Sequence, residues 1–225
     1  MKPDYEKLSR DLDYRFHDPD LLIQAMTHRS FGGRNNERFE YLGDAVLGFV
    51  IADVLFHHFK DATEGQLSRL RSALVKRDTL AKVARQFNLG DYLRLGQGEL
   101  RSGGHRRDSI LADSVEALIA AIYLDGGYPA AREMILATFS PRVEQLNPAK
   151  QQKDPKTRLQ EYLQANKYEL PSYDIQDISG DPHEQRFRVL CDVPGLQRQS
   201  LGEGTSRRKA EQDAALKMLA ELNHE

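Results

Sequence analysis

An acidic stripe runs along a long apolar segment of the chain, residues 38–59. Glu37, Glu40 and Asp44 are spaced i, i+3 and i+7, which places them on one face of a helix. The other faces are mostly apolar, so we expect this helix to be largely buried. Carboxylates stacked in a buried setting repel one another and need a compensating charge, for which a divalent cation is the usual partner.

A second segment has the same pattern. Asp113 and Glu116 are spaced i and i+3 inside another apolar helix. If the two helices cross at these positions, the second pair joins Glu40 and Asp44 in one cluster. Oxygen ligands without histidine or cysteine favour Mg²⁺ or Mn²⁺ over zinc, and such ions suit the hydrolysis of a phosphodiester. The spacing alone leaves open the alternative of two solvated acidic faces.

The chain changes character at the stretch NPAKQQKDP, residues 147–155. This stretch is polar and contains two prolines, which is typical of a linker. We therefore expect an N-terminal domain over residues 1–146, a flexible linker over 147–154 and a C-terminal domain over 155–225.

The two domains differ in their apolar spacing. Helical spacing predicts an all-α first domain with helices over residues 38–59, 64–88, 109–124 and 129–144 and a glycine-rich loop over 90–107. The second domain has strand-like alternation between two helices, with Phe187, Val189 and Cys191 on one face. The order α-β-β-β-α predicts a small α+β domain with helices against one face of an antiparallel sheet. Its predicted elements are helix 156–166, strands 173–178, 186–192 and 197–201, and helix 205–222.

Charge and cysteine content exclude several classes of protein. The 225 residues carry a formal net charge of −2, so the chain is no globally basic nucleic-acid binder, and only a local basic patch is compatible with it. Cys191 is the single cysteine, which excludes an internal disulfide and disfavours a cysteine zinc site. No apolar run approaches the roughly 18 residues of a membrane span. We therefore expect a cytoplasmic protein with no membrane partner.

Two motifs carry a resemblance to a known family. The stretch NERFEYLGDAVL, residues 36–47, closely resembles the signature of the bacterial ribonuclease III family, and DSILADSVEALIAAIYLDGG, residues 108–127, is similar to its second acidic segment. The C-terminal domain resembles a double-stranded-RNA-binding domain, so the resemblance covers nearly the whole chain. The signature usually has leucine and phenylalanine where this chain has Phe39 and Tyr41, and both changes keep an apolar side chain.

The resemblance implies roles for the acidic residues. It implies that Asp44 and Glu116 are the catalytic carboxylates. Glu37 and Glu64 match two supporting acids of the family, although Glu64 also fits the plain role of an acid at a helix N-terminus, where the helix dipole favours it. The implied metal-binding carboxylates are Glu40, Asp44, Asp113 and Glu116.

The resemblance also implies a reaction. It is the Mg²⁺-dependent hydrolysis of double-stranded RNA, with Mn²⁺ as an expected substitute, and it leaves 5′-phosphate and 3′-hydroxyl ends with short 3′ overhangs. The implied substrates are rRNA precursors and structured transcripts, and the implied assembly is a homodimer. The residues alone do not show whether the chain forms a dimer, because the apolar faces of segment 38–59 can be buried equally well in the core of a single chain. The alternative function is a protein that binds duplex RNA without cutting it.

The expected RNA contacts lie in both domains. Arg207, Arg208 and Lys209 stand in the first turn of the last helix, where helix amides and cations favour phosphate. Such cations also occur on ordinary amphipathic helices, and it is the resemblance that implies the phosphate contact. The resemblance implies further contacts through His183 in the loop between the first two strands and through Thr157, Gln160 and Glu161 of the first helix. In the nuclease domain the expected contacts are Gln24, Thr27, Asn36, Arg94, Arg101, Arg106 and Arg107. Thr27 equally fits a helix C-terminus.

Overall fold

The computed structural model describes residues 3–148, 154–180 and 185–222. Backbone contacts divide the chain into two compact units, Met1–Gln151 and Gln152–Glu225. Each unit has its own cluster of buried apolar side chains. The predicted fold class, an all-α unit followed by a small α+β unit, is confirmed.

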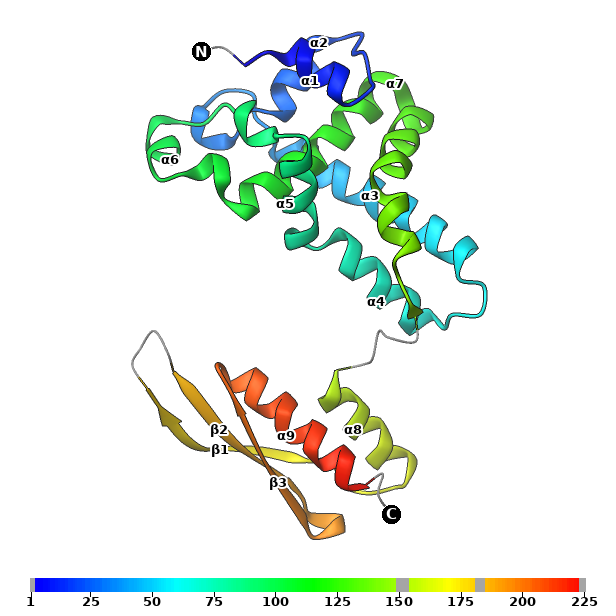
Figure 1. Cartoon of the computed structure of the whole chain (residues 1–225), viewed down its shortest axis with the longest axis vertical. Helices are drawn as coiled ribbons and strands as arrows, with labels where there is room; N and C mark the ends of the chain where they lie inside the picture. Colours follow the sequence, from blue (N-terminus) through cyan, green and yellow to red (C-terminus); the bar gives the residue numbers. More distant parts are fainter. Residues whose placement is uncertain (1–2, 149–153, 181–184, 223–225) are drawn as a thin grey trace. The chain divides into compact units, whose positions relative to one another are not determined.

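The N-terminal unit is helical (Figure 1). Helices α3 and α7 pack against each other through the centre of this unit, and α2 and α5 pack against α7. The helices are α1 (Tyr5–Asp11), α2 (Pro19–Ala25), α3 (Glu37–His58), α4 (Glu64–Val75), α5 (Arg77–Gln86), α6 (Gln97–Arg101) and α7 (Asp108–Glu144), with short 3₁₀ turns η1 (Arg29–Phe31), η2 (Leu89–Asp91) and η3 (Gly104–Arg106). No helix among these described residues or those of the second unit is long and apolar enough to cross a membrane.

Helix α3 covers the predicted apolar segment, but it is not buried on every side. Its inner face contributes Phe39, Leu47, Val50, Ile51 and Leu55 to the core. The side chains of Tyr41, Phe49 and Phe56 are 82%, 61% and 65% exposed, respectively. The prediction of a largely buried helix is therefore wrong for a single chain, because α7 and α4 cover only part of α3.

Three other boundaries differ from the predicted ones. The predicted helix 64–88 is two helices, because Lys76 adopts an extended backbone and the hydroxyl of Thr79 donates to the freed carbonyl of Ala73 at 2.7 Å. The predicted helices 109–124 and 129–144 both belong to α7, which bends at Gly127, where φ is 75°. The predicted loop 90–107 contains α6, η3 and part of η2.

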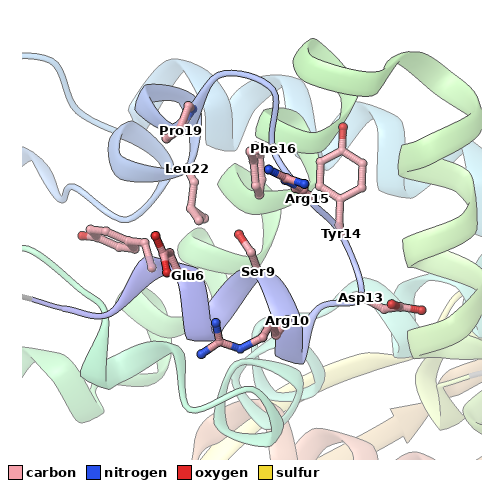
Figure 2. A pocket seen from close by; sticks show the side chains of 10 residues that line it. Glu6, Ser9, Arg10, Asp13, Tyr14, Arg15, Phe16, Pro19 and Leu22 are labelled. Carbon is pink, nitrogen blue, oxygen red and sulfur yellow. The ribbon is translucent and has the colours of Figure 1, made fainter.

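An anchor close to the bend of α7 holds the segment between α1 and α2. The carboxylate of Asp125, whose side chain is 2% exposed, accepts hydrogen bonds from the hydroxyl of Tyr14 at 2.7 Å and from the backbone amides of His17 and Asp18 at 2.9 and 2.8 Å. Figure 2 shows Tyr14 at the edge of a cavity of about 660 Å³ that α1 and this segment line. The residues that line this cavity include both acidic and basic side chains.

The C-terminal unit is an antiparallel sheet with two helices on one face (Figure 1). Val189, Cys191 and Val193 are fully buried beneath the helices, whereas Phe187, which was predicted on the same face, is half-buried. A Cβ at Gly202 would lie 2.2 Å from the carbonyl oxygen of Ala210, so the last helix sits directly on the third strand. The elements are α8 (Pro155–Ala165), β1 (Ser172–Ser179), β2 (Arg186–Val193), the 3₁₀ turn η5 (Pro194–Leu196), β3 (Arg198–Gly204) and α9 (Arg207–Leu222), with strand order β1-β2-β3.

Candidate functional site

Helices α3 and α7 cross where Gly43 meets Glu116. A Cβ on Gly43 would lie 1.7 Å from the carbonyl oxygen of Glu116, so no larger residue permits this approach. Glu40 is one turn before Gly43, and Asp113 is one turn before Glu116. The glycine contact therefore brings the acidic stripe of α3 to the acidic pair of α7.

Three carboxylates converge at this crossing. Oxygens of Glu40, Asp113 and Glu116 all lie within 4.8 Å of one another, and each side chain is half-buried. Asp44, which was predicted to join them, lies in the wall of the same pocket of about 780 Å³ but outside this close group. Glu37 also lines the pocket. The donor set is made of carboxylate oxygens alone, which fits a hard divalent cation.

Burial raises the pKa of all three carboxylates. Burial, together with the charges of Asp44, Asp113 and Glu40, raises the pKa of Glu116 to about 8. Burial and the neighbouring acids also raise the pKa of Glu40. For Asp113 the effect of burial outweighs that of nearby cations, and its pKa is raised as well. These acids are costly to ionise together, so a bound cation that neutralises their charge stabilises the ionised cluster.

Two charged residues that line this pocket, Arg29 and Glu99, were not recognised from the sequence as part of the site. Arg29 in η1 lies 3.5 Å from a carboxylate oxygen of Glu37, and its charge opposes the rise in pKa of both Glu40 and Asp113. Arg107, a predicted RNA contact, forms a 2.6 Å ion pair with Glu99, and both residues line the pocket. No spacing rule links Arg29 or Glu99 to acids on other helices, because only the tertiary fold brings them together.

Other predicted site residues of the N-terminal unit lie elsewhere. Glu64 lies outside the pocket, in the first turn of α4, and accepts a hydrogen bond from the hydroxyl of Ser68 at 2.8 Å. Its position fits the alternative of a helix N-terminal acid. Thr27 is 2% exposed, and its hydroxyl donates to the carbonyl of Ile23 at 2.6 Å. This geometry fits the alternative role of Thr27 at the end of α2, and its RNA contact stays a prediction.

The remaining predicted RNA contacts of this unit lie at the surface or in the wall of the pocket. Asn36 is buried in the pocket wall, and its amide nitrogen has no partner among the described residues. Gln24 donates its side-chain amide to the carbonyl of Asn35 at 3.0 Å. The guanidinium of Arg94 lies 4.3 Å from the ring centre of Phe31. Exposed cations on the neighbouring segment are Arg101, Arg106 and Arg107.

The predicted RNA contacts of the C-terminal unit are mostly exposed. Arg207, Arg208 and Lys209 are exposed in the first turn of α9. His183 lies outside the described residues. The predicted contacts on α8, which are Thr157, Gln160 and Glu161, are also exposed. Sequence reasoning missed Lys156 and Glu211, which connect the first turns of α8 and α9.

Comparisons with known proteins agree with both units. The model of the family described as Ribonuclease-III-like matches residues 18–143, and that of the double-stranded RNA binding motif matches residues 155–222. The chain is 56% identical over 225 residues to Ribonuclease 3 of Pseudomonas paraeruginosa, covering 100% of this chain and 98% of the relative. It is 52% identical over 224 residues to Ribonuclease 3 of Vibrio atlanticus, covering 100% of both.

A solved structure shares the fold of the first unit. The nuclease domain of ribonuclease III from Campylobacter jejuni matches with a TM-score of 0.61 and 44% identity, covering 65% of this chain and 100% of that one. The acidic crossing of α3 and α7 lies within the residues that match the family model. The chain therefore belongs to the ribonuclease III family and is an endoribonuclease with a double-stranded-RNA-binding domain.

Proposed function

We propose that the chain cleaves double-stranded RNA with Mg²⁺ bound at the crossing of α3 and α7. The observation that carries this proposal is the convergence of Glu40, Asp113 and Glu116 within 4.8 Å, with the pKa of each raised. When bound, the ion supplies Lewis acidity toward water and phosphate oxygens. Mn²⁺ prefers similar oxygen ligands and is expected to replace it.

The acidic residues divide into several roles. Glu40, Asp113 and Glu116 hold the ion, and Asp44 completes the set from the wall of the pocket. Asp44 and Glu116 are the proposed catalytic carboxylates: both line the pocket, and the charge of Asp44 acts on Glu116. Glu37 supports the site from the rim, where it pairs with Arg29. The geometry of Glu64 supports a role in α4 instead.

The proposed products have 5′-phosphate and 3′-hydroxyl ends. Two such sites acting across one duplex leave short 3′ overhangs, and this requires a homodimer. The exposed apolar side chains of Tyr41, Phe49 and Phe56 on α3 supply a face for a second copy. A ribonuclease III nuclease domain from Campylobacter jejuni has a region described as involved in dimer formation.

The proposed RNA contacts hold the duplex at both units. In the second unit, cations and amides at the start of α9 bind phosphate, and exposed side chains of α8 meet 2′-hydroxyls across the minor groove. In the first unit, Gln24, Asn36, Arg106 and Arg107 guide the duplex to the carboxylates. The proposed substrates are rRNA precursors and structured transcripts. A cytoplasmic location fits the buried free thiol of Cys191.

One experiment tests this proposal directly. An end-labelled duplex RNA of about 30 base pairs, long enough for a domain that spans about 16, is incubated with the protein in Mg²⁺ or in chelator. Cleavage and mobility-shift gels are run in parallel. We expect a shift in both conditions and cleavage only with Mg²⁺, and the Asp44→Asn variant should bind without cutting. Cleavage in chelator, or full activity of that variant, would contradict the metal assignment.

A further inference from the structure

A largely buried carboxylate, that of Glu211 in α9, joins the first turns of α8 and α9. One of its oxygens accepts a hydrogen bond from Nζ of Lys156 at 2.5 Å, and the other accepts one from Nε of Arg207 at 2.9 Å. The side chain of Glu211 is 12% exposed, whereas that of Arg207 is 60% exposed. Burial would raise the pKa of Glu211, but the hydrogen bonds from Lys156 and Arg207 outweigh it and lower that pKa, so the carboxylate stays charged.

The other partner of Glu211 is itself fixed. Nζ of Lys156 lies 4.2 Å from the ring centre of Tyr173, and its backbone amide donates to the carboxylate of Asp154 at 2.9 Å. The same carboxylate accepts a hydrogen bond from the side-chain amide of Gln212. Glu211 is therefore held between two packed helices and has little freedom to follow Arg207. The hydrogen bond between Glu211 and Arg207 therefore determines the position of the exposed side chain of Arg207.

We propose that Glu211 is a positioning residue for RNA binding, which holds Nε of Arg207 so that the two terminal amino groups of its guanidinium face a phosphate of the duplex. This inference rests on the proposed phosphate contact of Arg207. A guanidinium fixed at Nε keeps its planar fork in one orientation and has less side-chain entropy to lose when it binds. Lysine has no equivalent of Nε, so only arginine can be held in this way.

The sign of one substitution separates positioning from simple electrostatics. Duplex RNA is a polyanion, so removing a nearby carboxylate strengthens its long-range attraction to the domain. Electrostatics alone therefore predicts that Glu211→Gln binds RNA more tightly. Positioning predicts weaker binding, because the freed side chain of Arg207 loses its orientation.

Glu203 provides a matched control. Its carboxylate accepts a hydrogen bond from Nε of Arg188 at 3.1 Å and lies 3.0 Å from the terminal amino group of the same guanidinium, between β2 and β3 of the same domain. Gly202 faces α9, so Glu203, the next residue of the strand, points to the opposite face of the sheet. Glu203→Gln thus removes the same charge and frees an arginine away from the start of α9.

The test measures affinity of the full chain for a duplex RNA of about 30 base pairs, in chelator and over a range of salt concentrations. We expect Glu211→Gln to weaken binding about fivefold, while Glu203→Gln binds at least as tightly as the unchanged protein. Arg207→Ala should weaken binding as well, and adding Glu211→Gln to it should cause no further loss, because coupled residues are not additive. Thermal melting of each variant shows that it is folded.

Each failure has its own meaning. Unchanged or tighter binding by folded Glu211→Gln would overturn the positioning role and leave the contact of Arg207 in place. The same fivefold loss in the Arg207→Ala background would show that Glu211 acts elsewhere. Full affinity of Arg207→Ala would remove the proposed phosphate contact, and the positioning role with it.

If Glu211→Gln does not fold, Glu211→Asp replaces it. The shorter carboxylate cannot reach both cations, and unchanged affinity in that folded variant would also overturn the inference.

Discussion

Gly43 of α3 and Glu116 of α7 are in direct backbone contact, and this contact sets the geometry of the proposed metal site. A Cβ at position 43 would lie 1.7 Å from the carbonyl oxygen of Glu116. The glycine of the motif NERFEYLGDAVL is therefore required by the approach of two helices that carry the acids. Its role is steric, although it lies in a stretch whose most visible feature is charge.

Gly43→Ala should separate the two helices and abolish cleavage. The added methyl group overlaps backbone, which no side-chain rotation relieves, so we expect a loss of stability of about 1–3 kcal/mol and a cleavage rate at least about 100-fold lower. The measurements are thermal melting and single-turnover cleavage of duplex RNA. Gly98→Ala in α6 is the control, because the space around Gly98 is open, and it should retain activity. Normal cleavage by folded Gly43→Ala would show that the site tolerates a displaced α7.

The metal-free protein should become less stable as the pH rises from about 5 to about 8. The pKa of Glu116 is raised to about 8 in the folded chain, so the folded state binds a proton that the unfolded state releases near its ordinary pKa. Stability should therefore fall across this window relative to Glu116→Gln, which lacks the ionisable group. Differential scanning calorimetry in chelator measures the difference, and excess Mg²⁺ should remove it. Parallel pH profiles of the two proteins in chelator would contradict the raised pKa.

Asp125→Asn should loosen the segment that leads into α2. The carboxylate accepts hydrogen bonds from Tyr14 and from the amides of His17 and Asp18, and those bonds outweigh burial and lower its pKa to about 2. A lowered pKa stabilises the fold fully above the ordinary pKa of the acid, and this stability is lost as the pH falls toward 2. We expect the variant to lose on the order of 2 kcal/mol at neutral pH. A wild-type advantage that persisted unchanged at pH 2 would be inconsistent with this charge effect.

Phe49→Asp combined with Phe56→Asp should shift the protein to a monomer. Both rings are more than half exposed on α3, and two charges on an apolar interface are costly to bury. Light scattering coupled to size-exclusion chromatography measures the mass. Leu216→Asp, which changes an exposed apolar residue of α9, should leave the mass unaltered. A dimer that survives the double change would place the interface on another face.

Local patterns predicted the elements of this fold better than its contacts. The i, i+3 spacing of the acids depends only on helix geometry, so the stripe on α3 and the pair on α7 were both predicted from it. The break at Lys76 was not, because residues 64–88 keep helical apolar spacing across it. The hydrogen bond from the hydroxyl of Thr79 to the carbonyl of Ala73, which helps to compensate for the break, is not visible in that spacing. The burial of Thr27 could not be predicted from the sequence either, since it depends on the tertiary packing at the end of α2.

The site was predicted in part for the same reason. Glu40, Asp113 and Glu116 converge because a glycine lies opposite a backbone carbonyl, and a sequence shows that glycine without showing what it faces. Asp44 was placed in the same group from its spacing, but it lies one turn further along α3 and faces the pocket from its wall. Glu211 was overlooked because a charged residue in an amphipathic helix gives no sign of partners on another helix.

The contact between Gly43 and Glu116 also determines when the carboxylates of the proposed metal site are assembled. Both helices are fixed by the hydrophobic core, so the carboxylates are brought together as the chain folds and not as an ion arrives. The conformational entropy of gathering them is lost during folding, and ion binding then requires little rearrangement of the backbone. Binding of an ion at a preorganised site of this kind should show only a small change in heat capacity.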